Sequence, residues 1–107
     1  MTTFDRREES FENKYAHDEA LRFRIDSRRN QHLGAWAAKL LGKSEADAAI
    51  YVQEVLKAEL EEAGDEDVFR KIRQDFDAAG VDQSDHQLRA AMDEFMKTAK
   101  EQVMKEG

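Results

Sequence analysis

Apolar residues recur every three or four positions along most of the chain, and glycines divide this pattern into four stretches. The spacing predicts helices at about 17–41, 45–63, 66–79 and 85–104. The sequence has no proline, and Gly42, Gly64 and Gly80 stand where three of these stretches end. No segment alternates apolar and polar residues for long enough to predict a strand. The pattern therefore predicts an all-α fold.

The residues after each glycine favour the start of a new helix. Ser44 precedes Asp47 by three positions, and Ser84 precedes Gln87 by three, which is the spacing of an N-terminal capping box. Residues 65–67 are all acidic and suit the positive end of a helix dipole. Connections of two to five residues make successive helices antiparallel neighbours, so the four helices are expected to form a bundle with a short third member.

Each predicted helix carries an apolar stripe that must be buried against the other helices. The stripe assigned to the second helix consists of Ala46, Ala49, Ile50, Val52, Val55, Leu56 and Leu60. The core of the bundle is predicted to centre on Trp36, Phe69, Ile72 and Phe95. On this assignment, Phe69→Ala is expected to cost about 3–5 kcal/mol of stability.

Composition excludes several classes of function. Charged residues make up 38% of the 107 residues and the net charge is -7, which argues against nucleic acid as a partner. The absence of cysteine excludes disulfides, thiolate metal sites and cysteine nucleophiles. No apolar run approaches the roughly 20 residues of a membrane span, and no secretory signal follows the first arginines. A cytoplasmic protein without direct membrane insertion is expected.

The usual signatures of catalysis and metal binding do not occur in the sequence. His17, His32 and His86 lack the spacing of a helical metal site, so no metal is expected. Pairs of carboxylates lie near predicted helix ends, where the helix dipole accounts for them. Phosphate-binding loops, nucleophile elbows and dinucleotide fingerprints are missing as well. These observations predict that the protein is not an enzyme.

A group of arginines is unusual in so acidic a chain. Arg22, Arg24, Arg28 and Arg29 fall within eight residues of the first predicted helix. One interpretation is a solvated stripe that pairs with Asp18 and Asp26. The other is an anion site in which the guanidinium groups bind phosphate. Trp36 or Phe23 would then stack on a base, and Asn30 or Gln31 would contact the sugar or the base. The sequence alone leaves both interpretations open.

Large aromatic residues also occur where charge is densest, in "FDRREESFENKYAHDEALRFR" (residues 4–24). A helix over residues 3–17 would place Phe4, Phe11 and Tyr15 on one side. An isolated helix of this length is marginally stable in water, so the segment is expected to be mobile in the free protein. Its aromatic residues would then bind another protein; alternatively, Phe11 and Tyr15 extend the first helix against the bundle.

Three further stretches resemble a known family: "KYAHDEALRFR", "RRNQHLGAWAA" and "DVFRKIRQDFDAAG". Their order and spacing are similar to those in the zeta subunit of alphaproteobacterial F-type ATP synthases, and the resemblance runs from Phe4 to about Val103. Ser27 replaces an expected alanine, and the chain ends early in "VMKEG". The resemblance implies a four-helix bundle at residues 17–107 and a protein that inhibits ATP hydrolysis.

The resemblance also implies how inhibition works. Residues 1–16 would form the inhibitory segment and enter a cleft between the alpha and beta subunits beside the gamma subunit. The partner-binding residues would be Phe4, Arg6, Arg7, Glu8, Phe11, Lys14 and Tyr15. The protein would be a monomer when free and cytoplasmic, peripheral to the inner membrane through ATP synthase.

Weak binding of ADP or ATP to the bundle is a further implication, with no cofactor required. The candidate nucleotide-binding residues are Arg22, Arg24, Arg28, Arg29, Asn30 and Trp36. Two alternatives to the inhibitor remain at this point. The chain could be a small nucleotide-sensing helical domain, or it could be a generic helical adaptor.

Overall fold

The computed structural model describes residues 19–59 and 65–106, and this part of the chain contains four helices and no strand. The helices are α2 (Glu19–Leu40), α3 (Glu45–Glu59), α4 (Glu66–Ala79) and α5 (Asp85–Glu106). The predicted all-α class and four helices are confirmed. The described helix ends lie within two residues of the predicted ones, except that α3 is described only as far as Glu59. Predicted helical residues 17–18 and 60–63 lie outside the described residues.

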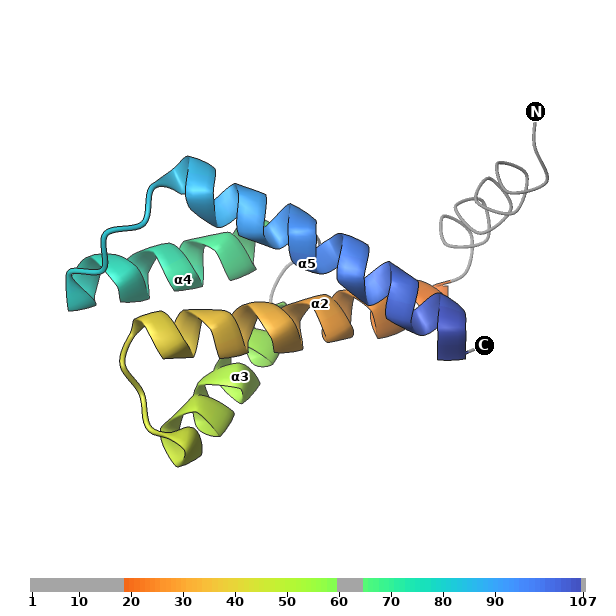
Figure 1. Cartoon of the computed structure of the whole chain (residues 1–107), viewed down its shortest axis with the longest axis horizontal. Coiled ribbons are helices and arrows are strands. Elements are labelled where there is room, and N and C mark those ends of the chain that lie inside the picture. The colour runs from red at the N-terminus through yellow and green to blue at the C-terminus, as the bar shows by residue number, and fades with distance from the viewer. Residues whose placement is uncertain (1–18, 60–64, 107) are drawn as a thin grey trace.

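The helices form a bundle in which each packs against its sequence neighbours and α5 returns to pack against α2 (Figure 1). α2 and α5 have 22 residues each, whereas α3 has 15 and α4 has 14. The two long helices therefore extend as an antiparallel pair. Figure 1 shows the orange beginning of α2 beside the dark blue end of α5, opposite the loop between α4 and α5. We call this pair, residues 19–28 and 96–106, the arm.

The buried apolar side chains form two clusters. The main core joins all four helices and consists of Leu33, Ala37, Ala38, Tyr51, Val55, Val68, Ile72, Phe76, Leu88 and Met92. The second cluster contains Ile25, Ala99 and Val103, with Leu21 and Met96 packed against it. Within the described part of the chain, only α2 and α5 contribute to this second cluster, so the arm has a core of its own.

The helix ends follow the local signals in the sequence. Gly42 and Gly80 have φ angles of 73° and 69°, the left-handed conformation that ends many helices. The Gln87 amide donates to Ser84 Oγ at 3.1 Å, and the Ser84 amide donates to Gln87 Oε1 at 2.8 Å. The predicted capping box is therefore confirmed in its reciprocal form.

The predicted stripe of α3 is wrong in its centre. Ile50 is 61% exposed, and Ala46 and Ala49 are exposed as well. The helix instead buries Tyr51, together with Val55 and Ala58. The Tyr51 hydroxyl donates to Asp75 Oδ2 at 2.7 Å, so the ring can be buried without leaving its polar atom unpaired. Val55 of the predicted stripe is buried, and Val52 and Leu56 are partly buried, so the error is confined to Ala46, Ala49 and Ile50.

The predicted centre of the core is partly correct. Ile72 is fully buried, and Trp36, Phe69 and Phe95 are partly buried residues that pack against the main core. Phe76 is the largest apolar side chain that is fully buried. Phe69 lies under the Arg89 guanidinium, which is 3.8 Å from the ring centroid. Removing its ring therefore empties less interior space than the sequence suggested.

Candidate functional site

The arginine cluster of α2 is divided among three environments. Arg22 is exposed and makes no ion pair with any described residue. Arg24 and Arg28 lie beside the end of α5, whereas Arg29 is only 1% exposed. This division follows from helix geometry, since each residue is turned about 100° from the one before it. The cluster is therefore not a single cationic surface.

Arg24 and Arg28 share one carboxylate. Glu106 accepts from Arg24 Nη2 at 3.0 Å and is 2.7 Å from Arg28 Nη1. Arg28 also donates to Gln102 Oε1 at 3.2 Å, and that oxygen is 2.9 Å from His32 Nε2. The hydrogen bonds from Arg28, and then those from Arg24, hold the pKa of Glu106 below its usual value. Both arginines thus pair with Glu106 of α5. Of the two partners that the sequence suggested, Asp18 lies outside the described residues, and the charge of Asp26 acts on Arg29.

Arg29 joins three helices inside the protein. Its Nη2 atom is 2.8 Å from Asp65 Oδ1, before α4, and 3.7 Å from Glu59 Oε2, at the end of α3. Its Nε atom donates to Asn30 Oδ1 at 2.7 Å. Burial opposes the charge of Arg29, but the hydrogen bond and charge of Asp65 raise its pKa overall. Burial also raises the pKa of Glu59, against the opposing charge of Arg29.

Asn30 and Trp36 do not complete a surface site with the arginines. Asn30 is fully buried, and its Nδ2 atom has no hydrogen-bond partner within the described part of the chain. The Trp36 ring makes edge contacts with Phe76 and Phe95, at centroid distances of 5.8 and 6.2 Å. It also lies about 12 Å along the helix from Arg28. Of the six candidate nucleotide-binding residues, Arg22, Arg24 and Arg28 remain open to solvent.

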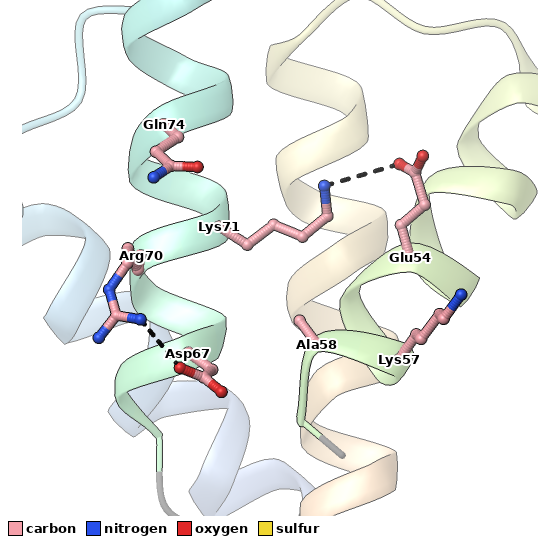
Figure 2. A pocket seen from close by; sticks show the side chains of 7 residues that line it. All are labelled: Glu54, Lys57, Ala58, Asp67, Arg70, Lys71 and Gln74. Atoms are coloured by element: carbon pink, nitrogen blue, oxygen red, sulfur yellow. Dashed lines mark hydrogen bonds and ion pairs between the residues drawn. The ribbon is translucent and has the colours of Figure 1, made fainter. Parts of the chain in front are cut away.

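A groove between α3 and α4 is a second place where cations gather, and the sequence did not predict it. Figure 2 shows the seven residues that line it: Glu54, Lys57, Ala58, Asp67, Arg70, Lys71 and Gln74. Lys71 reaches across the groove to within 3.8 Å of Glu54, and Arg70 is 3.1 Å from Asp67. Lys57 makes no ion pair with any described residue. Finding this groove required knowing which faces of α3 and α4 meet.

The seven residues assigned to partner binding all lie outside the residues that the structure describes: Phe4, Arg6, Arg7, Glu8, Phe11, Lys14 and Tyr15. Their expected mobility therefore stays a prediction. Within residues 19–59 and 65–106, no group of three or more histidine or acidic side chains could hold a metal ion. None of the four described helices is both long and apolar enough to cross a membrane.

Comparisons with known proteins give the chain a family. No curated protein sequence matches it. A protein whose structure was determined by solution NMR is 41% identical and similar in fold, with a TM-score of 0.70; the match covers 81% of this chain and 99% of that one. The sequence model of the family described as ATPase inhibitor subunit zeta matches residues 1–102. The chain therefore belongs to the ATPase inhibitor subunit zeta family.

Proposed function

We propose that this inhibitor blocks ATP hydrolysis by inserting residues 1–16 at an interface of the alpha, beta and gamma subunits in the catalytic sector of F-type ATP synthase. The observation that carries the proposal is the family match, which spans residues 1–102 and so includes the N-terminal segment as well as the helices. The protein acts from the cytoplasm as a monomer and reaches the inner membrane only through ATP synthase. Its role is regulatory, and the catalytic groups belong to the enzyme.

The composition of residues 1–16 supports insertion between proteins. In a helix over residues 3–17, Phe4, Phe11 and Tyr15 would offer apolar surface on one side, and charged residues would occupy the other sides. Burial of aromatic surface, at about 25 cal/mol per Å², offsets the free energy needed to order the segment. Within the described part of the chain, the residues of the main core come from all four helices, α2 to α5. The four helices therefore form the folded domain to which the inhibitory segment is attached.

Photo-crosslinking tests where the segment binds. Replacement of Phe11 by p-benzoylphenylalanine should give crosslinks to the alpha, beta or gamma subunit when the variant inhibits the purified catalytic sector. The same replacement at Ile50, an exposed position on α3, is the matched control and should give few crosslinks. Inhibition by the Phe11 variant without crosslinks to any of the three subunits would rule out insertion at their interface.

We also propose that ADP and ATP bind weakly beside the arm, where Arg24 and Arg28 expose guanidinium groups next to each other. Arg24→Ala combined with Arg28→Ala should weaken the ADP-induced changes in amide chemical shifts, because phosphate loses both forked donors. Arg29 stays unchanged in this test, since its substitution would disturb the buried cluster rather than a surface.

The groove between α3 and α4 provides the comparison for this prediction. Lys57→Ala combined with Arg70→Ala removes two of its cations and should leave the ADP titration as in the unsubstituted protein. If the Lys57 and Arg70 variant lost the ADP-induced shift changes while the Arg24 and Arg28 variant kept them, the nucleotide would instead bind between α3 and α4.

A further inference from the structure

We propose that the exposed side of the arm is a second contact surface for the catalytic sector, beside the cleft that residues 1–16 enter. This inference rests on the proposed function and adds a binding surface to it. The surface is a shallow recess of about 380 Å³ on α2, lined by Ala20, Phe23, Arg24, Ser27, Arg28 and Gln31. Its partner is an acidic surface of the catalytic sector that projects an apolar group into the recess.

Phe23 is the apolar anchor of this surface. It is 61% exposed, because its neighbours in the recess, Ala20 and Ser27, are small and leave its ring accessible. Aromatic side chains surrounded by polar groups are enriched at protein interfaces, where they often contribute most of the binding energy. Ile50 is exposed to the same extent, but its neighbours one turn away on α3 include the acidic Asp47 and Glu54.

Charge favours an acidic partner. Arg24 and Arg28 share the single carboxylate of Glu106, so one positive charge remains uncompensated there. The recess is thus bordered by positive charge in a protein whose net charge is -7. Such a patch speeds association with an acidic surface and sets its orientation.

The recess is expected to face the catalytic sector because it lies close to residues 1–16 in the chain. α2 begins at Glu19, and Ala20 already lines the recess. Phe23 comes seven positions after residue 16, which is about 10 Å along a helix and no more than about 25 Å in an extended chain. If residues 1–16 enter a cleft of the enzyme, the recess must therefore lie close to the mouth of that cleft.

The arm holds the recess in a fixed shape. Ile25 packs against Ala99 and Val103 of α5 on the other side of α2, and Glu106 ties down Arg24 and Arg28. Side chains that are already ordered before binding lose less conformational entropy in a complex. The long α5 helix thereby supports a surface on α2 that it does not itself form.

Inhibition of ATP hydrolysis by full-length variants tests the proposal. Phe23→Ala should raise the concentration needed for half-maximal inhibition about tenfold, while Ile50→Ala, at a position of equal exposure, should leave it unchanged. Arg24→Ala should slow association, because Arg24 lines the recess, and the effect should shrink at high salt. Circular dichroism should show unchanged helix content and melting for all three variants, because the three side chains are exposed.

These experiments distinguish failure of the second contact surface from failure of the proposed insertion of residues 1–16. If the unsubstituted protein inhibits, deletion of residues 1–14 abolishes inhibition, and Phe23→Ala inhibits as well as Ile50→Ala, the segment acts alone and the second surface is refuted. Tighter inhibition by Phe23→Ala would also refute it, because the recess would then hold residues 1–18 in the free protein. Unchanged inhibition after the deletion would instead refute insertion of the segment.

Discussion

Replacement of Phe76 by alanine is expected to lower the free energy of unfolding by about 3–5 kcal/mol, since a large buried side chain would leave a cavity in a close-packed core. Phe76 is fully buried and packs edge-on against Trp36 at a centroid distance of 5.8 Å. It is one of three buried apolar side chains of α4, with Val68 and Ile72, so the short helix has few other anchors. Urea denaturation followed by circular dichroism measures the change.

Phe69→Ala is the matched control on the same helix. Phe69 is only partly buried, and the Arg89 guanidinium covers one face of its ring. Solvent can fill part of the space left by this ring, so the loss of stability should be clearly smaller than for Phe76→Ala. Equal losses for the two variants would contradict the assignment of Phe76 to the centre of the core.

Substitution of Arg29 has the second largest expected effect. Arg29→Ala should destabilise the fold by about 3 kcal/mol, at the lower end of the range for breaking a buried ion pair. The lower end applies because Asp65 has a side-chain exposure of 47% and remains partly solvated, whereas Glu59 at 20% loses its nearby cation. Thermal and urea unfolding of the variant give the measurement.

Two further variants show whether charge or packing causes the loss. Arg28→Ala breaks an exposed ion pair and should change stability by no more than about 1 kcal/mol. Adding Glu59→Gln to Arg29→Ala should recover part of the stability, because the buried carboxylate without a cation is then gone. No recovery in the double variant would mean that the lost packing of the Arg29 side chain, and not its charge, explains the effect.

Local signals in the sequence were sufficient for the helices and their ends. Gly42 and Gly80 adopt the left-handed conformation that glycine favours, and Ser84 and Gln87 form the capping box that their spacing predicts. These features depend on residues a few positions apart, so no knowledge of the tertiary structure was needed. The stripe of α3 was mispredicted in part, because Tyr51 is a core residue whose hydroxyl pairs with Asp75 on another helix.

The environments of the arginines in α2 could be predicted only in part from the sequence. Arg29 lies four residues after Ile25 and four before Leu33, both fully buried, so its place in the apolar stripe could have been noticed. Its partner Asp65 is 36 positions away, and only the packing of the helices brings the two together. The same holds for Glu106, which lies at the far end of the chain from Arg24. Contacts between helices thus decided which arginines reach solvent.

The most direct test of the central claim is an assay of ATP hydrolysis by the purified catalytic sector of F-type ATP synthase. The full-length protein and a variant lacking residues 1–14 are titrated in parallel, after circular dichroism has shown equal melting of the two. Insertion of residues 1–16 predicts that the full-length protein inhibits hydrolysis and that the shortened protein, with its bundle intact, does not. Equal inhibition by both proteins at the same concentration would contradict it.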